Sequence, residues 1–174
     1  MTNPFFNQIM NYKVGIYMTN GISSEQAFEH AWKYFELHSS QRTTLFNYFL
    51  FIVAGLGAGI GATFQASNDL LYIGTFLSMF VVLVSIVFWK LDQRTSFLVK
   101  QSESILKTLE GNSDSAIGIF INENANLIEE NKNRNYFSKI LTYGAVFRFT
   151  FRVTSFVGIG LVILFVIKIL GCLT

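Results

Sequence analysis

The sequence predicts an all-α integral membrane protein: a transmembrane helical hairpin with cytoplasmic helical extensions, followed by a third transmembrane helix at the C-terminus. Three observations lead to this fold class. Charged residues make up 14% of the 174 residues, against about 25% in an ordinary soluble domain. No charged residue occurs between Thr43 and Asn68 or between Leu70 and Trp89. The C-terminal stretch Val153–Thr174 carries one charge, on Lys168.

Each of the first two uncharged stretches reaches the roughly 20 residues that a helix needs to cross a hydrocarbon core of about 30 Å. We therefore expect spans at 44–64, 70–89 and 153–174, with cytoplasmic helices at 1–43 and 90–152. The alternative is a soluble all-α protein with apolar buried helices. It is disfavoured because a chain of 174 residues is too short to enclose three such helices.

The bases beside the spans set the predicted orientation, because cationic loops stay on the cytoplasmic side. The short link 65–69 has one acid and no base, whereas 90–152 carries nine bases. We expect a multi-pass protein of the bacterial inner membrane, with its N-terminus in the cytoplasm and its C-terminus in the periplasm. Residues 1–19 lack a signal-peptide pattern, so the first span is expected to act as the insertion signal.

Local signals predict where the helices begin and end. Asn3-Pro4 resembles a helix start, and the helix that follows is expected either to lie on the membrane surface or to pack under the bundle. Ser23 or Ser24 is expected to cap one helix that runs from residue 24 to residue 64. Another helix is expected from Ser113 or Asp114 to Asn131, and a last one over 136–170.

The second span is expected to continue as a helix beyond Trp89 to Gly111. Leu91, Leu98 and Ile105 recur every seven residues there, which predicts a short coiled-coil seam.

Alternate glycines occupy the middle of the first span, at Gly55, Gly57, Gly59 and Gly61, with Ala58 among them. They lie inside an apolar helix, so they do not form a phosphate loop. Small residues four apart let helix backbones approach closely in lipid. We expect this surface to pack on the second span and on a neighbouring subunit of a homo-oligomer; the alternative is packing within one subunit.

Polar residues gather where the first two spans enter the membrane: His38, Gln41 and Arg42 on one side, Asp92 and Arg94 on the other. In an antiparallel hairpin these stretches lie at the same depth. Arg42 is expected to pair with Asp92, and Arg94 with an acid such as Glu36. A role in fixing the hairpin is favoured over a role as a gate.

Arg148 and Arg152 stand one turn apart among phenylalanines before the third span. Their expected role is contact with lipid headgroups, or else with an anionic ligand.

An enzymatic function is not expected. His30 and His38 are eight residues apart and no second pair completes a metal site. The sequence holds no nucleotide-binding or nucleophile motif, so we expect no catalytic residue, no metal and no cofactor. The net charge of +2 gives no indication of nucleic-acid binding.

Two stretches carry a resemblance to a known family: Trp32-x-Tyr34-Phe35-x-Leu37-His38-x-x-Gln41-Arg42 before the first span, and Phe88-Trp89-Lys90-Leu91-Asp92-x-Arg94 after the second. Their layout resembles the small two-span, SLATT-like membrane effectors of bacterial anti-phage defence systems, over about Trp32–Glu110. The resemblance implies a protein that oligomerises and permeabilises the inner membrane when infection is sensed. The third span departs from the two-span pattern.

The resemblance favours a non-enzymatic, homo-oligomeric effector that forms a pore or perturbs the membrane when a cytosolic partner or ligand triggers it. Two alternatives stay open: a membrane adaptor that anchors a cytosolic partner without conducting, and a phage holin-like protein. The expected partners are the lipid bilayer, further copies of the chain and a cytosolic protein or signal.

Overall fold

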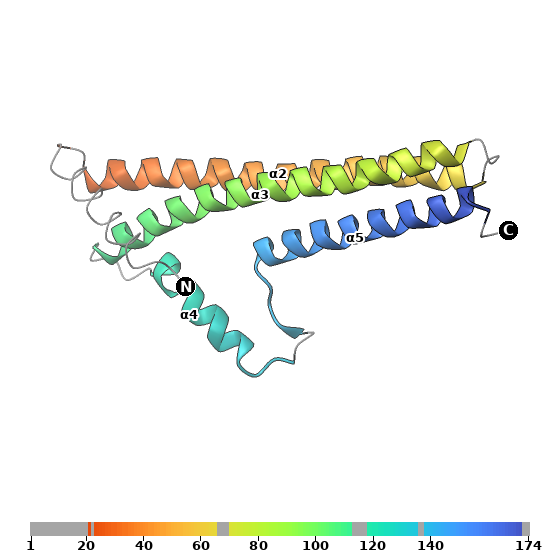
Figure 1. Cartoon of the computed structure of the whole chain (residues 1–174). Coiled ribbons are helices and arrows are strands. Elements are labelled where there is room, and N and C mark those ends of the chain that lie inside the picture. The colour runs from red at the N-terminus through yellow and green to blue at the C-terminus, as the bar shows by residue number, and fades with distance from the viewer. Residues whose placement is uncertain (1–20, 22, 66–69, 113–117, 136–137, 172–174) are drawn as a thin grey trace. The chain divides into compact units, whose positions relative to one another are not determined.

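The computed structural model describes residues 21, 23–65, 70–112, 118–135 and 138–171, and these contain helices and no strand. The helices are α2 (Ser24–Gln65), α3 (Leu71–Gly111), α4 (Ile119–Asn131) and α5 (Tyr143–Ile169) (Figure 1). The helix expected after Asn3-Pro4 lies outside the described residues. The chain divides into two compact units: unit 1 is 1–41 with 95–141, and unit 2 is 42–94 with 142–174.

Three helices, α2, α3 and α5, are long and apolar enough to cross a membrane. This agrees with the all-helical fold class, while insertion and orientation stay predictions. The long continuous helices expected from the sequence are confirmed, because α2 ends at Gln65 and α3 at Gly111. A capping box begins α2: Gln26 N donates to Ser23 Oγ, and Ser23 N donates to Gln26 Oε1.

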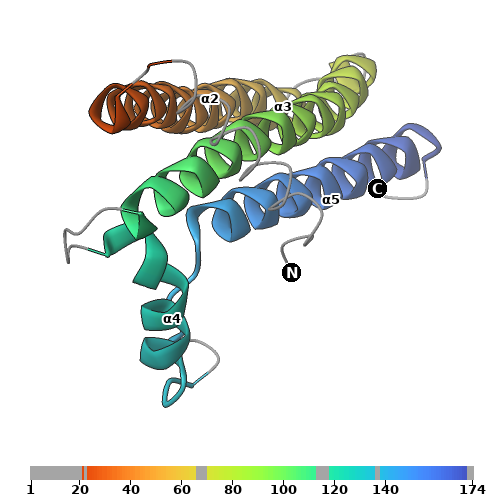
Figure 2. The ribbon, with the colours of Figure 1, turned by 90° about the vertical axis from the view of Figure 1, so that its left-hand side faces the viewer.

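In unit 2, segments of α2, α3 and α5 run alongside one another (Figures 1 and 2). The residues of α2 that face the other two helices are spaced alternately by four and three, which places them on one stripe. We call this stripe the seam face; it comprises Arg42, Phe46, Phe49, Val53, Leu56, Ile60 and Thr63. Phe49 on α2 and Phe165 on α5 are fully buried in it.

The buried positions of α3 also follow a seven-residue repeat, through Leu71, Ser78, Ser85, Asp92 and Leu106. The predicted seam of Leu91, Leu98 and Ile105 is therefore wrong at Leu91, whereas Ile105 packs on the cluster of Ala31, Leu106 and Leu109. Leu91 is 40% exposed, while its neighbour Asp92 is buried. The repeat that begins inside the apolar stretch sets the register of the whole helix, since α3 is continuous.

In unit 1, the first turns of α2 pack on the last turns of α3 around Ala31, Leu106 and Leu109. Phe120 of α4 adds to this cluster, edge-on to Trp32 and Phe35 at centroid distances of 6.1 and 5.7 Å. Beyond this contact α4 contains no buried residue.

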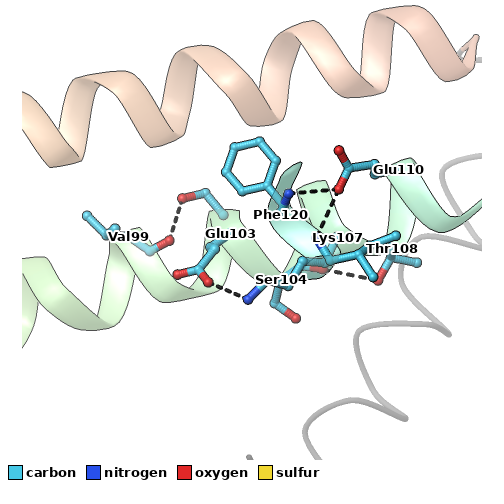
Figure 3. A network of polar contacts seen from close by, with 9 residues as sticks. Val99, Glu103, Ser104, Lys107, Thr108, Glu110 and Phe120 are labelled. Carbon is cyan, nitrogen blue, oxygen red and sulfur yellow. Dashed lines mark hydrogen bonds and ion pairs between the residues drawn. The ribbon is translucent and has the colours of Figure 1, made fainter. Parts of the chain in front are cut away.

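The predicted start of α4, at Ser113 or Asp114, lies outside the described residues. The described helix begins at Ile119. Gly118, which the prediction placed inside the helix, precedes it and has a left-handed backbone with φ 54°. The carboxylate of Glu110 accepts hydrogen bonds from the N–H groups of Ile119, Phe120 and Ile121, at 2.7, 2.9 and 3.0 Å. Figure 3 shows Glu110 at the backbone of Phe120, next to the Glu103–Lys107 pair of α3.

The last helix starts later than predicted: α5 begins at Tyr143, and 139–142 precede it as non-helical chain. The amide of Asn131 explains part of this, because it bonds both the N–H and the C=O of Ile140 and so satisfies groups that a helix would pair internally. Gly171, with φ 70°, follows the end of α5.

Candidate functional site

The ion pair expected between Arg42 and Asp92 is present in unit 2. Arg42 Nε donates to Asp92 Oδ1 at 2.6 Å and Nη2 donates to Oδ2 at 3.2 Å, a two-pronged geometry that strengthens such pairs. The side chains are 13% and 5% exposed. The Arg42 guanidinium also lies 5.4 Å from the ring centre of Phe147. The pair therefore connects α2 to α3 under the beginning of α5.

The predicted collar also includes His38, Gln41 and Arg94. His38 and Gln41 lie in unit 1 and contact each other within α2, His38 Nδ1 being 2.9 Å from Gln41 Oε1. The His38 ring also packs on Tyr34, at a centroid distance of 4.2 Å. Arg94 is exposed in unit 2. Its expected partner Glu36 belongs to unit 1, so that pairing stays a prediction.

Aromatic side chains fix α5 against α2 next to the Arg42–Asp92 pair. Phe147 stacks on Phe46 with centroids 4.0 Å apart and planes at 10°, and Phe151 stands edge-on to Phe49 at 4.7 Å. Arg148 lies between Phe147 and Phe151 in the sequence, and its Nε donates to the carbonyl of Gly144 at 2.8 Å. Arg152 is exposed.

The glycines of α2 lie largely off the seam face. A Cβ added at Gly55, Gly57 or Gly61 would meet nothing within 4 Å, whereas one at Gly59 would lie 3.2 Å from Leu77 Cδ1. Ala58 is exposed. Among the described residues, Gly59 is therefore the glycine of this stripe that meets the second span, and larger side chains of α2 make the rest of that contact. We call the surface at Gly57 and Gly61 the glycine face; Gly55 lies on another side of α2, because residues two apart are about 200° apart around a helix.

Close helix packing in unit 2 depends instead on glycines that sequence reasoning missed. A Cβ at Gly74 would lie 2.3 Å from the Phe165 ring and 2.6 Å from Thr63 Oγ1. A Cβ at Gly158 would lie 2.8 Å from Val82 Cγ2. The partners of Gly74 and Gly158 lie far away in the sequence, so the sequence carried no signal of them.

Within the described ranges, no three His, Cys, Asp or Glu side chains gather in a way that could hold a metal ion. The chemistry that the site does offer is that of charge and packing: a buried ion pair, arginines at the start of α5, and a helix face of small residues.

Comparison with known proteins gives one clear relative. The chain is 40% identical over 142 residues to CD-NTase-associated protein 19 of Escherichia coli, which covers 79% of this chain and 89% of that protein. No protein-family model matches the sequence. No solved structure matches it either.

Proposed function

Because the chain belongs to the family of CD-NTase-associated protein 19, we propose that it acts as the membrane effector of its defence system. The family relationship indicates a component of a CBASS anti-phage system. The finer proposal is a non-enzymatic homo-oligomer that perturbs or permeabilises the bacterial inner membrane when a partner protein or ligand of that system triggers it. The narrower SLATT-like resemblance is not needed for this proposal.

The glycine face carries the proposal. Within one chain the most apolar stretch of α2 is 11% buried, against 33% for α3, and the surface at Gly57 and Gly61 has room for a close neighbour. In lipid, helices associate by backbone approach over such small residues, since hydrophobicity provides no drive. A second copy of α2 would suit this surface, and an oligomer built on it would bring several spans together around one axis.

The adaptor alternative has an observation of its own in unit 1. Helix α4 is held by the Glu110 cap and by Phe120, and it leaves Ile119, Ile121 and Ile128 65, 46 and 71% exposed. A cytosolic partner could cover these side chains. An adaptor would bind that partner without changing the permeability of the membrane.

The deciding experiment measures membrane potential with a fluorescent dye in cells that express the chain with its neighbouring defence genes, during phage infection. The effector proposal expects depolarisation that Gly57→Leu abolishes, together with loss of the oligomer in neutral detergent. Gly160→Leu on α5 is the matched control, because a Cβ there also meets nothing within 4 Å. Unchanged potential during infection, with a partner protein bound to the chain, would establish the adaptor instead.

A further inference from the structure

Helix α4 is held in place by polar bonds at both of its ends and not by burial of its side chains. At its start, the carboxylate of Glu110 accepts hydrogen bonds from three backbone N–H groups. At its end, the amide of Asn131 bonds both the N–H and the C=O of Ile140. No residue of the helix itself is buried. The helix is therefore preformed, while most of its surface stays accessible.

One side of α4 presents apolar side chains with an acid at their edge. Ile121, Ala125, Ile128 and Glu129 occupy positions i, i+4, i+7 and i+8, which share one side of a helix. Ile121 and Ile128 are 46 and 71% exposed, and Ala125 and Glu129 are exposed as well. We call these four residues the α4 stripe.

The charge of α4 is of one sign. Its 13 residues include three acids and no base. Glu130 pairs with Arg134, and Glu123 lies on the side of the helix opposite to the α4 stripe. Among the described residues, Glu129 has no basic partner. An occupant that suits the α4 stripe therefore combines apolar side chains with a base.

Residues 1–20 have this composition. They contain one charged residue, the base Lys13, and no acid. Apolar side chains recur around it at helical spacing, at Phe5, Phe6, Ile9, Met10, Ile16 and Tyr17. On the helix expected after Asn3-Pro4, residues 9, 13 and 16 would follow one another along one side. Lys13 would then lie in the middle of the apolar side.

The position of Lys13 favours a protein surface over the membrane surface. A helix that lies on a bilayer carries its bases on the polar side and keeps its apolar side free of charge. A base in the middle of an apolar side needs an acid beside it once that side is covered. Glu129, at the edge of the α4 stripe, supplies such an acid.

The attachment of residues 1–20 to the rest of unit 1 allows this contact. Gly21 has a left-handed backbone with φ 78°, a conformation that is typical just after the end of a helix. Helix α2 follows directly, and α4 packs on it through the contact of Phe120 with Trp32. Trp32 is nine residues after Ser23, which is about 14 Å along a helix, whereas residues 4–20 would form a helix of about 25 Å.

We propose that residues 1–20 dock on the α4 stripe, with their apolar side chains on Ile121 and Ile128 and the Lys13 ammonium beside the Glu129 carboxylate. All of these residues belong to unit 1. The contact requires neither an oligomer nor permeabilisation, so it does not rest on the proposed function. A cytosolic partner that binds the α4 stripe would first have to displace residues 1–20.

The test measures how fast a cysteine in the α4 stripe reacts with a maleimide. The full-length protein in neutral detergent carries Cys172→Ser and Ala125→Cys. The matched control carries Asn126→Cys instead, because Asn126 is also exposed but is turned about 100° away around the helix. Docking of residues 1–20 should make labelling at residue 125 about tenfold slower than at residue 126.

An apolar substitution tests the contact itself. Ile128→Ser should raise the labelling rate at residue 125 about tenfold, as the loss of one covered isoleucine predicts. Ile119→Ser is the matched control, because Ile119 is 65% exposed and lies on another side of α4. It should change the rate less than about twofold. Both isoleucines are exposed, so neither substitution disturbs the packing of α4 on α2.

Charge reversal identifies the occupant. Lys13→Glu should raise the labelling rate at residue 125 about fivefold, because it replaces an attraction to Glu129 by a repulsion. Adding Glu129→Lys to Lys13→Glu should restore the slow rate. Adding Glu123→Lys, on the opposite side of α4, should not. Equal rescue by the two reversals would overturn the proposal, because it would indicate a general effect of net charge.

Slow labelling that Lys13→Glu abolishes and Glu129→Lys restores would support the proposal. Slow labelling that does not respond to Lys13→Glu would overturn it. The occupant would then be a second copy of the chain if the rate rises on dilution, and the detergent micelle if it does not. Equally fast labelling at residues 125 and 126 would overturn the proposal too, because the α4 stripe would then be uncovered.

Discussion

The two faces of α2 differ in the size of their residues and in what they pack against. On the seam face, large side chains fill the space between α2, α3 and α5, and Phe49 is completely buried. On the outward side, Phe51 is 79% exposed, and a Cβ added at Gly57 or Gly61 would meet nothing within 4 Å among the described residues. The difference teaches that α2 contributes large residues to the contact with its own chain's helices, while its small residues are left facing outward. An outward face of small residues suits a partner helix better than it suits lipid.

The largest expected effect contrasts two phenylalanines of the same helix. Phe49→Ala should lower the free energy of unfolding by about 3–5 kcal/mol, because it leaves a cavity among packed aromatic rings. Phe51→Ala should leave it nearly unchanged in the isolated chain. Chemical unfolding in detergent, followed by circular dichroism, measures both. Similar losses in the two variants would contradict the division of α2 into two faces.

A second contrast compares the buried Arg42–Asp92 ion pair with the exposed Arg134–Glu130 ion pair. Asp92→Ala should cost about 3–5 kcal/mol, because it strands the Arg42 guanidinium without its carboxylate in a part-buried site. Glu130→Ala removes the exposed partner of Arg134, whose pair has side chains 41 and 64% exposed, and should cost about 0–1 kcal/mol. The same unfolding measurement checks both. An equal cost would mean that Asp92 is hydrated when the protein is folded.

The third contrast concerns glycines. Gly74→Ala should destabilise unit 2 by about 1–3 kcal/mol, because its Cβ collides with the buried Phe165 ring. Gly55→Ala should change stability by less than about 1 kcal/mol, and in the stabilising direction, since alanine favours a helix. Thermal unfolding of the two variants in one detergent checks the sign. Destabilisation by Gly55→Ala would show that Gly55 is covered within the single chain.

The smallest effect is expected at the exposed Glu29–Lys33 pair near the start of α2. The Lys33 ammonium donates to Glu29 and lowers the pKa of its carboxyl, while the pKa of Lys33 is raised in turn. A lowered carboxyl pKa contributes stability above its unfolded value, and this is lost as pH falls through the folded value. Lys33→Gln should return the Glu29 pKa to its ordinary range in an NMR titration. The unfolding midpoint should not move, because both groups are solvated.

Sequence reasoning predicted the parts of the fold that depend on composition and local chemistry. The uncharged stretches predicted the long helices, and antiparallel geometry predicted the pairing of Arg42 with Asp92. The sequence could not show which face of α2 is buried, because apolar residues lie all round this helix and hydrophobicity therefore does not distinguish one face from another. Gly74 and Gly158 were missed since their roles depend on Phe165 and Val82, which are distant in sequence. The starts of α4 and α5 depend on Glu110 and Asn131, whose partners lie nine or more residues away.

The Glu110 carboxylate links the end of α3 to the start of α4 through one side chain. It sits in the last turn of α3 and completes the unpaired N–H groups with which α4 begins. If that last turn of α3 unwound, the Glu110 carboxylate would move away from the start of α4. The N–H groups of Ile119, Phe120 and Ile121 would then lose their acceptor. The end of α3 and the start of α4 therefore melt as a single cooperative step, and a ligand that orders either of them orders both.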